Sequence, residues 1–261
     1  MHGAQRWFAV GGAGLVWLVL VAPIATLIAH LSPSSFLAAL RAPGALAPLV
    51  VSLESGAITL AVLVLGGAPL GWMLARRRLP AHRVVETGVL CTLLLPPLVV
   101  GLLLVFMVGP DTPVGHAIAA LHLSATNTLL ALVVAEIYES APYFVLGVQA
   151  AVAAVDPALE EQALLLGDTP RAAVRRVVLP LAAPGIAMSL AVAWARAMGA
   201  FGAVIIVAYH PYGLPLQIWT TLQETGLGSA LPFALVLLVV ALPLPVASYA
   251  WSVRARSRHL R

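Results

Sequence analysis

Three ionisable side chains interrupt long apolar runs of this sequence: Glu136, Glu139 and Arg196. The two glutamates are three residues apart, a spacing that places them on one face of a helix. A charged arginine deep in a membrane costs at least ~2.5 kcal/mol, so Arg196 is expected to face water or the interior of a helix bundle. There its guanidinium would supply positive potential for an anion, whereas the two carboxylates would suit proton carriage.

Residue counting places Glu136 and Arg196 at similar depth in their apolar runs. We therefore hypothesise that Glu136 and Arg196 form an ion pair inside the membrane. The alternative is that each side chain faces a wet cavity without pairing.

The residue types needed for catalysis or metal binding do not form a recognisable set. The seven histidines are scattered, and His116 and His122 share a loop without a metal-ligand pattern. Cys91 is the single cysteine and is expected to be a buried thiol. We predict no catalytic residue, no metal site and no cofactor bound by this chain.

All fourteen basic residues are arginine. A nucleotide-binding P-loop requires a lysine, so this chain is not an ATPase of that kind. Any use of ATP and Mg²⁺ is therefore expected to belong to a partner subunit. Apart from Arg196, the arginines lie at the ends of apolar runs, which argues against nucleic-acid binding.

The longest polar stretch, Asp156–Pro180, is predicted to form two short helices joined by a sharp corner. Asp156 can cap the first helix, and Gly167 can end it in the left-handed conformation that glycine tolerates. Either Asp168 or Thr169 can cap the second helix. The spacing of Leu159, Ala163 and Leu166 predicts one apolar face, and Glu160 and Glu161 lie near the positive end of the first helix dipole.

The order Glu161-Gln162-Ala163, three residues, Gly167, nine residues, Val177, one residue, Leu179-Pro180 resembles the Glu-Ala-Ala loop of permease subunits in ABC importers. Gln162 and Val177 depart mildly from the family pattern, which has Ala and Ile there. The resemblance implies a coupling loop over residues 153–183 that docks into a cleft of a cytoplasmic ATPase. The implied coupling residues are Leu159, Glu160, Glu161, Gln162, Ala163, Gly167 and Arg171. The alternative is an amphipathic loop lying on the bilayer.

Composition indicates an all-α integral membrane protein in one transmembrane domain covering residues 1–261. Hydrophobic residues make up 61% of the chain and charged residues 9%, against about 25% charged in soluble proteins. Several runs are long enough to span a bilayer. The six predicted spans are Trp7–Ala29, Leu49–Ala75, Val89–Val108, Thr126–Val152, Pro184–Tyr209 and Ala230–Trp251. The segments Leu31–Pro48 and Tyr209–Gly228 are expected to be external, and Gly109–Pro113 opens a further external segment between the third and fourth spans.

The distribution of arginine sets the expected orientation. Arg6, the segment 76–83, the coupling loop and the C-terminal tail all fall on one side, and Arg41 alone falls on the other. Positive charge accumulates on the cytoplasmic side, so both termini are predicted to be cytoplasmic in an inner membrane protein.

Two of the predicted spans contain unusual segments. Pro96-Pro97 removes backbone donors within the third span and would either kink it for packing or break it beside a pore. Arg196 opens the second segment, Arg-Ala-Met-Gly-Ala-Phe-Gly-Ala, in the fifth span. Gly67 and Gly71 form a small-xxx-small pattern in the second span, which favours close packing within one subunit.

Both unusual segments resemble the molybdate, tungstate and sulfate type of permease. The family pattern is Arg-Ala-x-Gly-Glu-Phe-Gly-Ala, so this chain has Ala200 where the family has glutamate. The residues expected along the translocation pathway are Pro96, Pro97, Glu136, Arg196, Gly199 and Phe201.

The resemblance implies a type I ABC importer permease that moves an oxyanion, molybdate or tungstate first, by alternating access. It implies a homodimer in lipid, two ATPase subunits and an external or periplasmic substrate-binding protein. Sulfate or another solute is the first alternative. An ion-coupled secondary transporter, with Glu136 and Glu139 as proton carriers, is the second.

Overall fold

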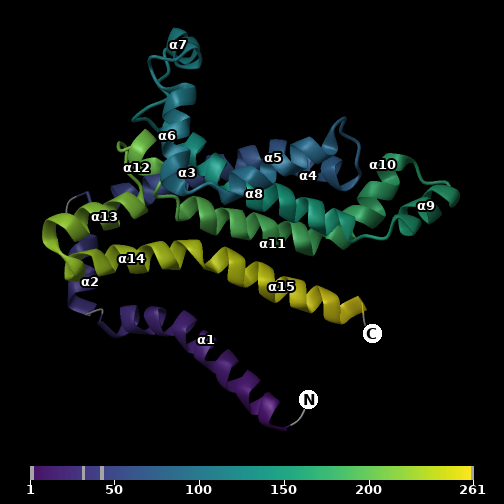
Figure 1. Cartoon of the computed structure of the whole chain (residues 1–261), viewed down its shortest axis with the longest axis horizontal. Coiled ribbons are helices and arrows are strands. Elements are labelled where there is room, and N and C mark those ends of the chain that lie inside the picture. Colours follow the sequence, from purple (N-terminus) through teal and green to yellow (C-terminus); the bar gives the residue numbers. More distant parts are fainter. Residues whose placement is uncertain (1–2, 31–32, 42–43, 260–261) are drawn as a thin grey trace.

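The computed structural model describes residues 3–30, 33–41 and 44–259, and every regular element in these ranges is helical (Figure 1). The α-helices are α1 (Gly3–His30), α2 (Pro33–Arg41), α3 (Ala47–Val62), α4 (Ala68–Ala75), α5 (His82–Leu94), α6 (Pro97–Val108), α7 (Pro113–Ala120), α8 (Leu129–Ala153), α9 (Pro157–Leu165), α10 (Pro170–Ala173), α11 (Leu179–Met198), α12 (Val204–Val207), α13 (Leu214–Thr225), α14 (Leu227–Ala241) and α15 (Pro243–His259). Two π-helical turns, Leu63–Gly67 and Val174–Val178, join α3 to α4 and α10 to α11.

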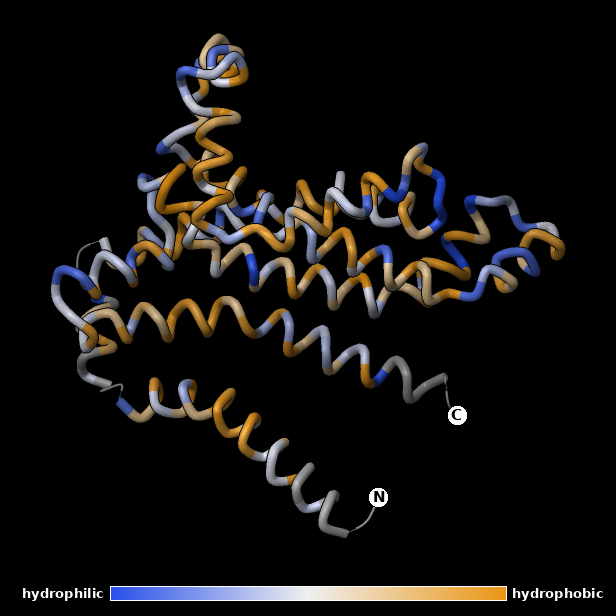
Figure 2. Tube along the Cα trace, viewed as in Figure 1, coloured by the Kyte–Doolittle hydropathy of each residue, from blue (hydrophilic) through white to orange (hydrophobic). Residues whose placement is uncertain are grey.

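The spans predicted from the sequence are present as helices. Five helical stretches of the described chain are long and apolar enough to cross a membrane, and the bent pair α5–α6 makes a sixth when counted as one span. The continuous stretches are Val10–His30, Ala47–Ala75, Leu129–Ala153, Pro170–Met198 and Leu227–Arg254. Figure 2 shows hydrophobic residues along these helices and hydrophilic ones at the α4–α5 turn and around α9.

The third span is broken outright. α5 ends at Leu94, α6 begins at Pro97, and the two axes differ by 118°. Leu95 and Pro96 have extended backbone. A residue that precedes proline is disfavoured in the α conformation, and each of the two prolines lacks an N–H, so the helix cannot continue through them.

The fifth span differs from its prediction at both ends. It begins earlier, because α10 continues through a π-helical turn into α11, and it ends at Met198 rather than Tyr209. Gly199 to Ala203 form a non-helical break before the short helix α12. The predicted span Pro184–Tyr209 would place Arg196 near its middle, whereas Arg196 lies in the last turn of α11.

The centre of the bundle is the antiparallel pair α8 and α11. α8 also packs against α3, α4 and α5, and α15 lies along α11. Gly67 and Gly71 face α8: a Cβ at Gly71 would lie 2.6 Å from the Val145 carbonyl oxygen, and one at Gly67 would lie 3.0 Å from the Phe144 ring. The small-xxx-small pattern thus serves packing within this subunit, as predicted.

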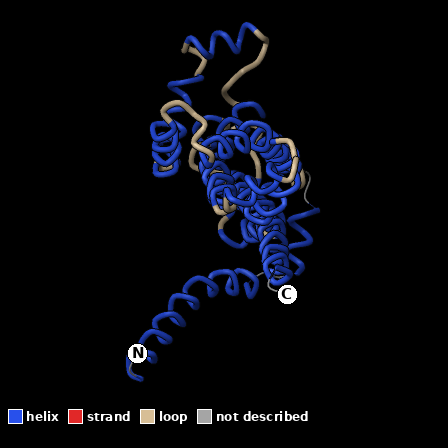
Figure 3. Tube along the Cα trace, turned by 90° about the vertical axis from the view of Figure 1, so that its right-hand side faces the viewer, coloured by secondary structure: helices blue, strands red, loops and turns tan. Residues whose placement is uncertain are grey.

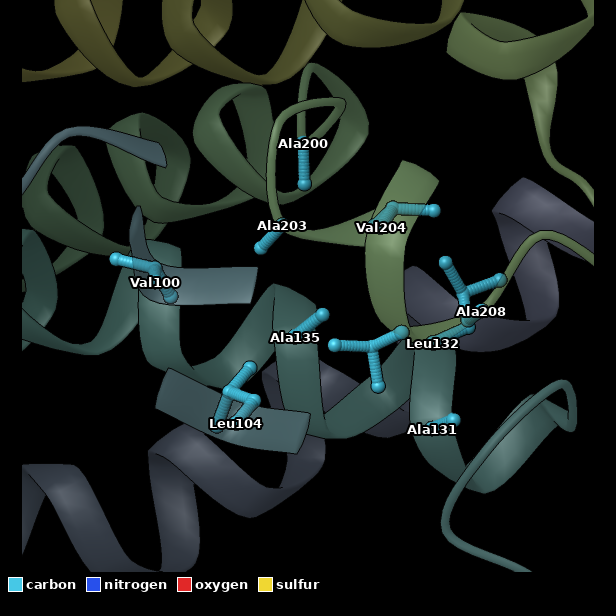
Figure 4. Close-up of a cluster of buried hydrophobic side chains, with 10 residues drawn as sticks. Val100, Leu104, Ala131, Leu132, Ala135, Ala200, Ala203, Val204 and Ala208 are labelled. Carbon is cyan, nitrogen blue, oxygen red and sulfur yellow. The ribbon is translucent and has the colours of Figure 1, made fainter. Parts of the chain in front are cut away.

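Two apolar clusters hold the bundle. One joins α6, α8 and α12 through Val100, Leu104, Leu132 and Val204, with the small residue Ala135 between them (Figure 4). The other joins the π-helical turns at Leu63 and Val178 to α8 and α11, and its larger members are Leu63, Phe144, Val148, Val152 and Val178.

α1 diverges from the bundle (Figures 1 and 3). None of its most hydrophobic stretch, Val10–His30, is buried within the chain. The predicted external segments contain the short helices α2, α7 and α13. Cys91 is exposed rather than buried, because α5 places it on its outer face.

Candidate functional site

The two broken spans meet at one place. A Cβ on Gly202 would lie 2.5 Å from the Pro97 Cβ, and one on Gly101 would lie 3.0 Å from the Ala203 carbonyl oxygen. The break after α11 therefore packs directly on the Pro96–Pro97 break. Non-helical backbone at membrane depth persists only where protein or a water-filled cavity satisfies its polar groups, and such breaks line transport sites.

Arg196 extends from the last turn of α11 toward α8. Its Nη2 lies 3.0 Å from Glu139 Oε2, and its guanidinium carbon lies 5.8 Å from the centre of the Tyr143 ring. The Glu139 side chain is 2% exposed, whereas that of Arg196 is 34% exposed. The carboxylate is thus buried behind a guanidinium that still reaches open space.

The ion pair predicted from the sequence had the wrong glutamate. Glu136 accepts hydrogen bonds from Ser55 Oγ at 2.7 Å and from Thr59 Oγ1 at 2.9 Å, so both of its oxygens face α3. Three residues along a helix rotate the side chain by about 60°. That rotation turns Glu139 toward α11, and the end of α11 at Met198 brings Arg196 level with Glu139.

Glu139 also fixes the break in the fifth span. Its Oε1 accepts a hydrogen bond from the Ala203 backbone N–H at 3.2 Å. One buried carboxylate therefore holds the end of α11 and the start of α12 together. The sequence places Glu139 and Glu136 on one helix face and does not show that they have different partners. The position at which α11 ends decides which of the two glutamates meets Arg196.

A cavity of about 390 Å³ opens where the breaks meet. Five of the six predicted pathway residues line it, namely Pro96, Pro97, Arg196, Gly199 and Phe201. Leu98, Glu139 and Gly202 complete the lining, and Glu136 lies apart from it. The arrangement places the Arg196 guanidinium, paired with the Glu139 carboxylate, in a cavity whose other lining residues are small or apolar.

The coupling loop has the predicted caps. The Asp156 carboxylate accepts from the Ala158 N–H at 2.9 Å, and Thr169, rather than Asp168, caps α10 by accepting from Ala172 N–H at 3.3 Å. Gly167 has φ +96°, the left-handed conformation that ends α9.

The apolar face of α9 is smaller than predicted. Ala163 is buried, but Leu159 is 40% exposed, and Leu166 lies beyond the end of the helix and is 89% exposed. Leu165 is 87% exposed. Glu161, Gln162 and Arg171 are also exposed. A loop with this many uncovered leucines presents an apolar surface between polar residues.

Two ion pairs involve the predicted coupling loop: one joins it to the end of α4, and the other lies within it. Arg76 Nη2, at the end of α4, lies 2.6 Å from Glu160 Oε2 in α9, and Arg176 Nη1 lies 2.6 Å from Asp168 Oδ1. In the described residues, no three His, Cys, Asp or Glu side chains gather as metal ligands would.

Comparison with known proteins identifies the fold and the family. A probable molybdenum ABC transporter permease of Haloferax volcanii is 36% identical over 229 residues, 88% of this chain and 84% of its own length. The sulfate transport system permease CysT of Salmonella typhimurium is 29% identical over 87% of this chain and 84% of its own. A crystal structure of a bacterial alginate ABC transporter, in complex with an alginate-bound periplasmic protein, superposes with a TM-score of 0.68 at 19% identity, over 96% of this chain and 95% of that one.

Residues 67–258 match the family model described as the binding-protein-dependent transport system inner membrane component. This range contains the predicted coupling loop, both span breaks and the Glu139–Arg196 pair. The chain therefore belongs to the family of inner membrane components of binding-protein-dependent transport systems and is an ABC importer permease.

Proposed function

We propose that this permease imports a tetrahedral oxyanion, molybdate or tungstate, through the cavity at the two span breaks. The observation that carries the proposal is the Arg196 guanidinium, paired with a buried carboxylate and still 34% exposed beside that cavity. Guanidinium N–H groups bind oxyanions through charge-assisted hydrogen bonds. Pro96, Pro97, Gly199 and Phe201 would shape the passage around the anion.

The relatives support molybdate ahead of sulfate. The Haloferax relative is named for molybdenum and is 36% identical, whereas the Salmonella relative is named for sulfate and is 29% identical. Sulfate stays the second candidate because it is also a tetrahedral dianion and would meet the same guanidinium.

The proposed assembly is a homodimer of this chain with two ATPase subunits and a substrate-binding protein. The exposed leucines of α9, with Glu161, Gln162 and Arg171, would form the surface that docks on the ATPase. ATP and Mg²⁺ would bind to that partner. Gly167 and Ala163 would keep the shape of the loop.

The proposed orientation places α9 and both chain termini in the cytoplasm. The arginines support it: Arg77, Arg78 and Arg83 at the α4–α5 turn lie at the same end of the bundle as α9 and α10, which carries Arg171 (Figure 1). Closure of the ATPase pair would then move α9 and switch the bundle between inward-open and outward-open states.

The test is uptake into proteoliposomes that contain the permease, its ATPase and its binding protein, with ATP present. Molybdate, tungstate and sulfate are compared at equal concentrations. The proposal expects molybdate or tungstate to be taken up at least tenfold faster than sulfate at limiting concentration. Faster uptake of sulfate would support the second candidate, and absence of uptake of all three would overturn the proposal.

A further inference from the structure

Arg76 and Glu160 form a shielded contact between two parts of the bundle that are distant in sequence. Their side chains are 14% and 17% exposed, against 66% and 24% for Arg176 and Asp168 in the other ion pair of the coupling loop. The Arg76 guanidinium also lies 5.7 Å from the centre of the Trp72 ring. The attraction between two charges is screened less when both are withdrawn from water. The face of the Trp72 ring separately attracts the Arg76 guanidinium and helps to hold it in place.

This contact attaches α9 to a helix that the chain does not connect to it directly. The backbone joins α9 to α8 on one side and to α10 on the other. The Arg76–Glu160 pair adds an attachment to α4. A displacement of α9 is therefore passed to the second span as well as to its own neighbours in sequence.

The second span, Ala47–Ala75, is in turn held along its length. Near its far end, Ser52 Oγ accepts a hydrogen bond from the Leu214 N–H of α13 at 2.8 Å. In its middle, Ser55 and Thr59 hold Glu136 of α8. The span thus connects the coupling loop at one end of the bundle to α13 at the other.

The same span reaches the candidate site through α8. Glu136 and Glu139 are one helical turn apart on α8, and Glu139 holds both Arg196 and the Ala203 N–H at the break. A movement of the second span relative to α8 would displace the Glu136 side chain, which Ser55 and Thr59 hold, and then the Glu139–Arg196 pair one turn further along α8.

We propose that Arg76 is a positioning residue that, through Glu160, transmits movement of α9 to the second span and so to the span breaks. This role rests on the proposed ATP-driven import. It predicts that breaking the pair uncouples transport from ATP hydrolysis without detaching the ATPase, because the exposed docking surface of α9 is left unchanged. Energetic coupling of this kind is shown only by measurement on both partners.

The test uses the complete complex in proteoliposomes with molybdate as substrate. The variants are Arg76→Gln, Glu160→Gln and the two combined, with Arg78→Gln as the matched control, since Arg78 is an exposed arginine two residues away. Three quantities are measured for each: ATPase bound per permease, ATP hydrolysed, and molybdate taken up per ATP.

The Glu160 side chain is turned toward Arg76 and is 17% exposed, so it lies outside the proposed docking surface. We therefore expect Arg76→Gln and Glu160→Gln to bind ATPase normally and to lower the uptake per ATP by about fivefold or more, the low end of typical coupling between sites. The double variant should be no worse than either single variant, because the two residues act as a pair. Arg78→Gln should match the unmodified protein. The charge-swapped pair, Arg76→Glu with Glu160→Arg, should regain part of the ratio.

An unchanged ratio in both single variants, or an equal fall in Arg78→Gln, would overturn the role of Arg76. The role would also be overturned if the fall in uptake per ATP of the double variant equalled the two single-variant falls combined. Should Arg76→Gln fail to assemble, the milder Glu160→Gln decides by the same criteria. If the unmodified complex takes up no oxyanion with ATP, the proposed function fails instead, so the two outcomes are distinguishable.

Discussion

Glu139 on α8 and Arg196 on α11 lie 3.0 Å apart at the place where the two broken spans touch. The pattern that this segment resembles has glutamate where this chain has Ala200, and Ala200 is buried. The carboxylate beside the arginine comes instead from the neighbouring helix. The charge of Arg196 is thus balanced across two spans, and the same carboxylate fixes the break at Ala203.

Arg196→Gln should reduce both stability and oxyanion uptake. It leaves the buried Glu139 carboxylate without its partner, and an unsatisfied buried polar group costs about 1–3 kcal/mol. We expect a lower unfolding midpoint in detergent and at least tenfold slower uptake.

The double variant Arg196→Gln/Glu139→Gln separates these two effects. It removes both charges, so it should recover most of the lost stability but not the uptake. Uptake at the rate of the unmodified protein in the double variant would show that the guanidinium does not act on the anion.

Ser55→Ala and Thr59→Val should each destabilise the bundle. Each removes a hydroxyl that donates to the buried Glu136 carboxylate, and an unsatisfied buried acceptor costs about 1–3 kcal/mol. Ser189→Ala is the control, because its hydroxyl bonds a carbonyl of its own helix and joins no two helices. Unfolding midpoints measure all three; a Ser189→Ala loss as large as the others would contradict the account of α3 and α8.

The contact between α4 and α8 can be tested with two glycines. Gly71→Ala would place a Cβ 2.6 Å from the Val145 carbonyl oxygen and 2.8 Å from Val148 Cβ, so we expect a loss of about 1–3 kcal/mol from overpacking. Gly66→Ala meets nothing within 4 Å. It should be neutral or mildly stabilising in a helix. Equal midpoints for the two variants would show that α4 does not approach α8 this closely.

Local signals in the sequence predicted the caps and the turn within residues 156–180 well. The caps at Asp156 and Thr169 and the left-handed Gly167 depend on neighbouring residues, so residue type and spacing were sufficient. The buried Ala163 fits the predicted face. The exposure of Leu165 and Leu166 was not predicted, because it depends on where α9 ends and on which other helices pack against that end.

Hydropathy predicted the number of spans but not the ends of the third and fifth. Both Pro96-Pro97 and the glycines after Met198 lie within apolar sequence, so a hydropathy window passes over them. The wrong partner for Arg196 followed from this error. When the fifth span is extended to Tyr209, counting residues from the span ends places Arg196 at the depth of Glu136. Which of the two glutamates faces Arg196 depends on where α11 ends and on how α8 is rotated about its own axis. The lengths of the spans alone give neither.

The exposed leucines at the end of α9 and just after it should be needed for ATPase binding and not for folding. Replacing Leu165 and Leu166 with serine removes two apolar side chains from the proposed docking surface, and we expect at least tenfold less ATPase to co-purify. Leu121→Ser is the control, since Leu121 is 71% exposed beyond the end of α7, far from α9 (Figure 1). An equal loss in Leu121→Ser, or normal ATPase binding by the double serine variant, would contradict the assignment of this surface.

The driving force is the most direct test of the whole account. Molybdate uptake is measured in proteoliposomes of the complete complex, once with ATP and Mg²⁺ on the α9 side and no ion gradient, and once with a proton gradient and no ATP. We predict uptake that requires ATP and is insensitive to the proton gradient. Uptake driven by the gradient without ATP would contradict the account and favour Glu136 and Glu139 as proton carriers in a secondary transporter.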